Sequence, residues 1–436
     1  MKLKKFFILI LAVIMSGSVF FTSCSNKDDD SDNSGSKDSK KSLRILWWGS
    51  QTRADATQEV LDNYAKENNV KFETEFADFK GYWDKIATFA STNSLPDIIQ
   101  QDNSYIVEYA TKNTLEDLQP YIDDGTFEKD NIPEDILELG VVNGKNYGIS
   151  LGVNTQSIIY NPELYKKADI PEPTGDMTWE EYFKDAEEIY KKTKIQVGLP
   201  FSKDPKLLIE YWVRSAGKTL YSEDGTSLGF DDEELLVDLF KEEQRLIKTG
   251  AIYDPAKAAL EIATEESSLV KEKSTGGFAW SNFLVQYNIA MNKKLGIVTL
   301  PKAPTGDEPG MYIKASMFFS VAASSENKEE AVKVINYFTN DIEANKILKA
   351  DRGVPISDLV RENLKDVVDE GTKQTFDYID VASEKANSAP PEPSGAQEIF
   401  TLAQDINDEV INNKKTPEEA AKDFIKKAND VLAKNK

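Results

Sequence analysis

Histidine is absent from the chain, and cysteine occurs once in 436 residues. Without an imidazole no side chain has an unperturbed pKa near neutrality, so Ser-His-Asp, Cys-His and HExxH mechanisms are excluded. A single cysteine also excludes an intrachain disulfide and the Cys-rich class of zinc sites. Carboxylate chemistry survives these exclusions, because the chain holds 75 Asp and Glu residues.

Positive charge is also in short supply. The chain has 52 Lys and Arg residues and a formal net charge of −23. Because such a chain repels a phosphate backbone and shows no basic stripe, nucleic-acid binding is not expected. No segment has the alternating oxygen ligands of a calcium loop, so neither a metal nor a cofactor is predicted. The remaining composition, 40% hydrophobic and 29% charged, is that of a globular protein long enough for more than one domain.

The N-terminal segment has the features of an export signal. Residues 1–5 are basic, and residues 6–21 form an apolar run too short to span a membrane comfortably. We therefore predict that residues 1–23 are a signal peptide and not part of the fold.

The signal is followed by a predicted lipid attachment site. Cys24 stands behind Thr22 and Ser23 where the apolar run ends, which resembles a bacterial lipobox. The alternative is an ordinary secretory signal with an incidental cysteine. Residues 24–41 are rich in Ser, Asp and Lys and predict a disordered tether. These features predict a globule held by lipid at the extracellular face of the cytoplasmic membrane.

The rest of the chain alternates short apolar runs with stretches of helical periodicity. Residues 44–47, 70–76 and 96–100 are predicted strands, with helices over 57–64 and 82–90 between them. This alternation predicts a parallel sheet with crossover helices, in which ligands bind beyond the carboxyl ends of the strands.

A second region repeats the alternation. Residues 179–193 are a predicted helix, capped by Thr178 with Glu181 as its capping-box partner. Strands are predicted over 195–199 and 277–280 and a long helix over 233–249. The sequence therefore predicts two α/β lobes of comparable size.

Seven segments carry a resemblance to a known family. They are LWWG at 46–49, LPDII at 95–99, YNPELY at 160–165, residues 173–180, GFAWS at 277–281, residues 319–323 with the helix 328–338, and RGVP at 352–355. In this order they resemble the extracellular solute-binding proteins of carbohydrate ABC importers, whose best-known relative is the maltodextrin-binding protein. The resemblance implies a type II periplasmic-binding-protein-like α/β fold with an interlobe cleft and a hinge. It also implies an oligosaccharide ligand, an ABC permease as partner, a monomer and no catalysis.

The resemblance further implies how the chain divides. The N-terminal lobe would comprise 42–154 plus 319–350, and the C-terminal lobe 155–318 plus 351–436. Crossing segments would lie near 154–160, 313–320 and 350–357. Two independently folded domains in sequence are the alternative.

Candidate aromatic residues follow from the chemistry of sugars, which offer an apolar face and a rim of hydroxyls. Trp48 follows the first strand and faces either ligand or core. Of Tyr82 and Trp83 one is expected to face the cleft, and we prefer Trp83. Trp280 ends a strand of the second lobe, whereas Trp212 is either a ligand residue or a core aromatic at helical spacing.

Polar candidates lie in the same loops. Asp102 follows the third strand and either accepts sugar hydroxyls or caps a helix over 103–111. The other candidates stand at a helix start, before a crossing, at the end of a strand and in RGVP; they are Ser50, Gln51, Arg53, Asn154, Ser281, Asn282 and Arg352. Arg53 is equally consistent with a solvated helix charge.

Two arginines suggest an acidic ligand. The segment 48–53 looks most like relatives that import pectin-derived or other plant oligosaccharides, and Arg53 with Arg352 would fit a uronate carboxylate. The alternative function is an extracellular glycoside hydrolase, which needs only two carboxylates across a sugar cleft.

Overall fold

The computed structural model describes residues 41–198, 204–253, 255–258, 264–308, 310–389 and 391–435. The predicted signal peptide and Cys24 lie outside these residues, as does the predicted tether apart from Lys41, which begins the first strand. All further description concerns the compact unit Lys40–Lys436.

The main sheet has the spatial order β2-β1-β3-β9-β6-β7. Its strands are β1 (Lys41–Trp48), β2 (Val70–Ala77), β3 (Ile98–Gln101), β6 (Ile149–Tyr160), β7 (Gly276–Trp280) and β9 (Tyr312–Val321), with β8 (Gly296–Val298) on β6 and β10 (Asn387–Ser388) on β9. β1 pairs in parallel with β2 and β3, whereas β9 runs antiparallel to both β3 and β6. A separate hairpin joins β4 (Val141–Val142) to β5 (Lys145–Asn146).

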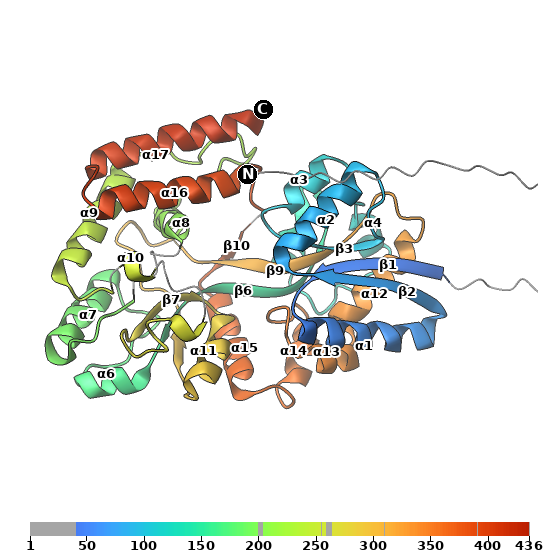
Figure 1. Ribbon diagram of the computed structural model, residues 1–436, viewed down its shortest axis with the longest axis horizontal. Coiled ribbons are helices and arrows are strands. Elements are labelled where there is room, and N and C mark those ends of the chain that lie inside the picture. The colour runs from blue at the N-terminus through green and yellow to red at the C-terminus, as the bar shows by residue number, and fades with distance from the viewer. Residues whose placement is uncertain are drawn as a thin grey trace, which may run out of the picture. The chain divides into compact units, whose positions relative to one another are not determined.

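The helices before β6 and after β9 surround the first part of this sheet. They are α1 (Gln51–Asn68), α2 (Phe79–Ser91), α3 (Ile106–Thr111), α4 (Gln119–Asp123), α5 (Glu134–Leu137), α12 (Lys328–Asn340), α13 (Ile342–Leu348) and α14 (Asp358–Leu364), with the 3-10 turn η1 (Glu138–Gly140). Figure 1 shows α1 and α2 on opposite sides of β1 and β2, the arrangement of a doubly wound sheet.

The second group of helices lies between β6 and β9 and at the C-terminus. It comprises α6 (Pro162–Ala168), α7 (Trp179–Thr193), α8 (Pro205–Ser215), α9 (Glu233–Thr249), α10 (Pro255–Ala258), α11 (Phe283–Met291), α15 (Glu370–Ser383), α16 (Ala396–Ile411) and α17 (Pro417–Leu432), with the turns η2 (Thr264–Glu266) and η3 (Ala433–Asn435). The predicted capping box of α7 is confirmed, since Thr178 accepts from the Glu181 N–H and Glu181 accepts from the Thr178 N–H.

β6 and β9 connect two large hydrophobic cores. The residues of β6 up to Val153 belong to the first core, and Ile158 and Tyr160 belong to the second. β6 accordingly pairs with β9 through Thr155 and with β7 from Gln156 onward. Figure 1 shows both strands running between the two groups of helices.

The C-terminal part of the chain, 351–436, contributes residues to both cores. The first core, not the second, contains Val354, Ile356, Val360 and Leu364. The segment is held there because the backbones of Val153 and Val354 exchange hydrogen bonds of 2.8 and 3.2 Å. α15 then contributes Phe376 to the first core and Tyr378 to the second, so the chain crosses over along this helix.

Two local predictions of secondary structure need correction. The predicted strand over 195–199 forms only isolated bridges at Gln196 and Val197, and Leu199 lies outside the described residues. The helix predicted over 103–111 begins at Ile106, because a turn occupies 103–105.

Candidate functional site

An aromatic cluster lies at the carboxyl end of β1. Trp48 is 8% exposed and packs edge-on against Phe79 and Tyr82, with ring centroids 5.4 and 5.1 Å away. Trp83 lies 5.9 Å from Trp48 and stacks on Tyr105 at 3.9 Å. Tyr82 is fully buried and donates its hydroxyl to the Gln100 carbonyl, whereas Phe79 is 47% exposed. Trp83 and Phe79 are therefore the rings of this cluster that a ligand can reach, whereas the buried Trp48 packs beneath them.

Buried polar atoms without partners occur at the end of β3, in the turn after it, on α2 and on β6. Gln101, the last residue of β3, is fully buried, and neither atom of its amide has a hydrogen-bond partner among the described residues. Asn103 Oδ1, Asn154 Oδ1 and Trp83 Nε1 are likewise buried and unpaired within the described chain. Each such group costs about 1–3 kcal/mol when it is left unsatisfied, so each is a candidate to bond with a hydroxyl of a ligand.

Asp102 lies between Gln101 and Asn103. Its Oδ1 accepts the Ser104 N–H at 3.0 Å, and its carbonyl accepts the N–H groups of Tyr105 and Ile106. The carboxylate thus stabilises the turn before α3. Its second oxygen makes no hydrogen bond with a described residue, so a ligand role stays a prediction.

The guanidinium group of Arg53 bonds to other residues of the protein. Its Nε lies 2.5 Å from Asp351 Oδ2, its Nη2 donates to the Asp351 carbonyl at 3.0 Å, and its Nη1 donates to the Trp48 carbonyl at 3.3 Å. Nearby, Ser50 caps α1 by accepting the Arg53 N–H, and the exposed Gln51 donates to Asp55 at 2.7 Å.

Arg352 is buried, with 4% of its surface exposed. It donates to Thr57 Oγ1 at 2.8 Å and to Gln100 Oε1 at 3.4 Å. Burial, together with the neighbouring charge of Arg53, lowers the pKa of Arg352 to about 9. Both guanidinium groups thus bond to first-core residues, but Arg352 Nη1 is buried without a partner among the described residues, so a role of these arginines toward a ligand carboxylate stays a prediction.

The second part of the site lies on the crossing strands. Asn154 pairs in register with Lys314, and Gln156 pairs with Trp280. Because alternate residues of a strand point to the same side, these four side chains share one face of the sheet. The Lys314 ammonium lies 4.1 Å from the centre of the Trp280 ring, and Tyr312 meets that ring edge-on at 5.9 Å.

A cavity of about 320 Å³ lies beside Trp280. Its lining is rich in aromatic side chains, namely Tyr253, Phe278, Phe283, Tyr287 and Phe400. Asp204 contributes a carboxyl whose pKa is raised by burial against the opposing effect of Lys206. None of these residues was predicted from the sequence, because they come from separate helices and loops with no shared local pattern.

Of the predicted residues Trp212, Ser281 and Asn282, the first two have structural roles. Trp212 is 2% exposed and packs edge-on against Trp179 at 5.3 Å, so the core interpretation of this residue holds. Ser281 is fully buried and exchanges hydrogen bonds with the Thr155 backbone at 2.9 and 3.3 Å. Asn282 is the N-cap residue of α11, although its side chain makes no capping bond.

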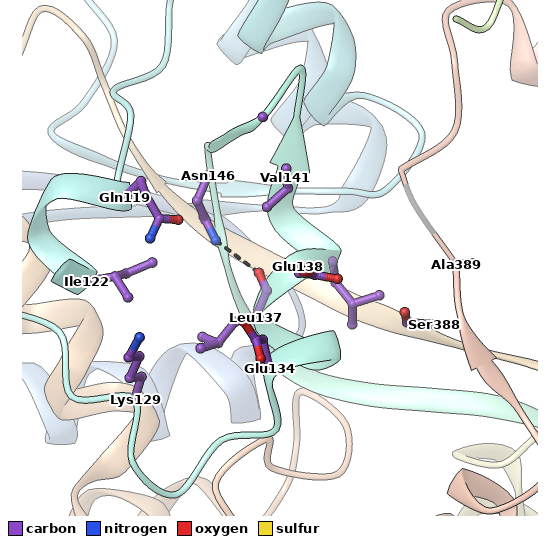
Figure 2. Close-up of a pocket in the computed structure, with 12 residues that line it drawn as sticks. Gln119, Ile122, Lys129, Glu134, Leu137, Glu138, Val141, Asn146, Ser388 and Ala389 are labelled. Atoms are coloured by element: carbon purple, nitrogen blue, oxygen red, sulfur yellow. Dashed lines mark hydrogen bonds between the residues drawn. The ribbon is translucent and has the colours of Figure 1, made fainter. Parts of the chain in front are cut away.

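A second hollow of about 470 Å³ lies between α4, α5 and the segment at Ser388. Figure 2 shows Gln119, Lys129 and Glu138 around it, with Asn146 bound to the Leu137 carbonyl at 3.0 Å. No aromatic ring is among the described residues that line it. This hollow is therefore a poorer match to a sugar than the cavity beside Trp280.

The described residues offer neither a metal site nor a membrane-spanning helix. No group of three or more Asp, Glu or Cys side chains in this part of the chain is arranged to hold a metal ion. None of the described helices has the length and apolarity needed to cross a membrane.

Comparison with known proteins identifies the class. Residues 48–344 match the family described as bacterial extracellular solute-binding protein. The chain belongs to this family, and the predicted membership is thereby confirmed.

Solved structures and a curated relative agree with this membership. An extracellular solute-binding protein family 1 structure from Alicyclobacillus acidocaldarius is 27% identical, with a TM-score of 0.76 over 90% of this chain and 99% of that one. A periplasmic oligogalacturonide binding protein from Yersinia enterocolitica is 20% identical, with a TM-score of 0.77 over 90% and 99%. The diacetylchitobiose binding protein DasA of Streptomyces coelicolor is 23% identical over 82% of this chain and 84% of that protein. The predicted two-lobed α/β fold is therefore confirmed; the lobe boundaries remain a prediction.

Proposed function

We propose that this solute-binding protein captures an oligosaccharide between its lobes and delivers it to an ABC importer. One observation carries the proposal. Aromatic rings and buried amides without partners among the described residues occur both near the ends of β1 and β3 and on the crossing strands. A pyranose offers its C–H face to rings such as those of Trp83 and Trp280, and its hydroxyls can donate to and accept from Gln101, Asn103 and Asn154.

The relatives lend support. DasA is named for diacetylchitobiose and the Yersinia protein for oligogalacturonides, so both names denote sugar oligomers. We infer that this chain binds a ligand of the same general kind and releases it unchanged to a permease. The energy of lobe closure would come from a ligand that prefers the closed state.

Binding to a panel of oligosaccharides tests this proposal. A true ligand at about 100 times its Kd is expected to stabilise the folded state by about 2.7 kcal/mol, which a thermal shift detects. Asn154→Ala should weaken binding about two- to tenfold in calorimetry, because it removes one hydrogen bond worth about 0.5–1.5 kcal/mol. The matched control is Asn363→Ala, whose side chain is exposed on α14 and bonds only within that helix.

Two results would overturn the proposal. One is the absence of any shift across neutral and acidic oligosaccharides. The other is turnover of a labelled oligosaccharide during prolonged incubation, which would favour a hydrolase over a binding protein.

We further propose that lipid on Cys24 holds the protein at the outer face of the membrane as a monomer. A Cys24→Ser variant is expected to appear in the culture medium, since the acidic globule has little affinity for anionic lipid. Fractionation followed by immunoblotting measures this, with Ser23→Ala as the control that should stay in the membrane fraction. Retention of Cys24→Ser in the membrane would contradict the anchor.

A further inference from the structure

We propose that Lys314 recognises a carboxylate of the ligand, so that the solute is an acidic sugar. This inference rests on the proposed function and adds two things to it, namely the charge of the ligand and the residue that binds the charged group. It differs from the prediction for Arg53 and Arg352, which bond to Asp351 and to Thr57 with Gln100 and leave only Arg352 Nη1 unpaired among their buried nitrogens.

The position of Lys314 is the first argument. It lies within β9, directly opposite Asn154 on β6, where the two strands connect the cores. Its side chain is partly buried and shares a face of the sheet with Trp280 and with Asn154, whose Oδ1 is unpaired. A sugar that contacts the Trp280 ring and bonds to Asn154 would therefore meet the ammonium as well.

The second argument is that no carboxylate is bonded to Lys314, although the charges of Asp204 and Glu392 act on it at longer range. Its ammonium makes no hydrogen bond or ion pair with a described residue, and its main contact is the Trp280 ring at 4.1 Å. A cation over an aromatic face gains about 0.5–2 kcal/mol, less than a well-placed hydrogen-bonded carboxylate can offer. The flexible lysine stem allows the ammonium to leave the ring for such a partner.

The neighbouring charges have other partners. Glu392 lies 2.5 Å from Lys206, and Asp204 caps α8 by accepting the Leu207 N–H at 3.0 Å. Arg214, the other cation of this region, lies over the Tyr312 ring at 5.1 Å, with the carboxyl of Glu210 as its electrostatic neighbour. Lys314 is therefore the cation best placed to meet an incoming carboxylate.

Calorimetry with matched acidic and neutral ligands tests the proposal. The probes are di- and trigalacturonate, a glucuronate-containing disaccharide, and the methyl ester of each. We expect the wild-type protein to bind at least one acid tenfold or more tightly than its ester, and we expect this preference to weaken as salt is raised. Lys314→Met should abolish the preference and its salt dependence while leaving affinity for the ester within about threefold. Lys314→Arg should restore part of the preference, since it returns the charge.

A control variant and the contrary outcomes distinguish failure of this inference from failure of the proposed function. Lys426→Met removes an exposed charge on α17 and should leave the preference unchanged. Equal binding of acid and ester, or equal loss of both in Lys314→Met, would overturn the role of Lys314 while leaving oligosaccharide binding intact. If only neutral sugars bind, the acidic-ligand inference fails alone. If nothing in the combined panel binds, the proposed function fails with it.

Discussion

Replacing Lys206 by Met is expected to lower the free energy of unfolding by about 3–5 kcal/mol, the range observed when one partner of a buried ion pair is removed. The Lys206 side chain is 6% exposed, and its Nζ lies 2.5 Å from Glu392 Oε1. Burial opposes the charge of Lys206, but the attraction of Glu392 outweighs it and raises the pKa of the ammonium well above its usual range. Without this cation Glu392 and the buried Glu210 lose their compensating charge. Urea unfolding at pH 7, followed by circular dichroism, measures the loss.

A second variant and a surface pair control this experiment. Lys206→Met combined with Glu392→Gln should recover more than half of the lost stability, because the stranded charge is removed as well. Lys241→Met breaks the pair with Glu418 at 3.1 Å, whose side chains are 51% and 60% exposed, and should cost at most about 1 kcal/mol. If Lys206→Met cost no more than Lys241→Met, the buried pair would not stabilise this part of the second core.

Replacing Glu243 by Gln is expected to raise stability at neutral and alkaline pH. Glu243 on α9 is 2% exposed, and neither carboxyl oxygen has a partner among the described residues. Burial raises the pKa of this carboxyl to about 8, against the opposing effect of Asn407. The folded chain thus keeps a proton that the unfolded chain loses near pH 4.3, so stability falls as pH rises between these two values. The accumulated loss at pH 7 is on the order of 3 kcal/mol, and the Gln variant does not suffer it.

Unfolding at pH 5 and at pH 8 measures the effect. The stability of Glu243→Gln relative to the wild type should increase between these pH values, and other titrating groups cancel in the difference. Asp238→Asn changes an exposed acid on the same helix and should leave the pH profile parallel to that of the wild type. A parallel profile for Glu243→Gln would show that the carboxyl is already ionised in the folded protein.

Sequence patterns predicted those elements whose formation depends on residues close together in the chain. Apolar runs predicted β1 and β3, because a buried strand needs consecutive apolar residues, and alternation of apolar and polar residues predicted β2. Thr178 with Glu181 predicted the start of α7, because the capping box closes over three residues. No local pattern predicted that residues 354–364 pack in the first core. These residues join the first core through the backbone contact between Val153 and Val354, which the sequence does not encode locally.

The candidate site shows the same division. The rule that ligands bind beyond strand ends in α/β sheets brought Trp48, Trp83 and Trp280 into consideration, and the crossing segment implied by the family resemblance added Asn154. The choice between core and cleft for Trp212 did not follow, because helical spacing of an aromatic residue is the same in both cases.

The sequence by itself determined the family, the two-lobed α/β fold and, through the absent histidine and lone cysteine, the exclusion of imidazole and disulfide chemistry. Only the tertiary structure decided which positive charges are available to a ligand. Arg53 bonds to Asp351, 298 residues away in the sequence, and the buried Arg352 bonds to Thr57, 295 residues away. Lys314, by contrast, lies on a crossing strand with its ammonium beside the Trp280 ring. The physical reason is that the freedom of a charge depends on its partners and its burial, and both are set by contacts between segments far apart in the chain.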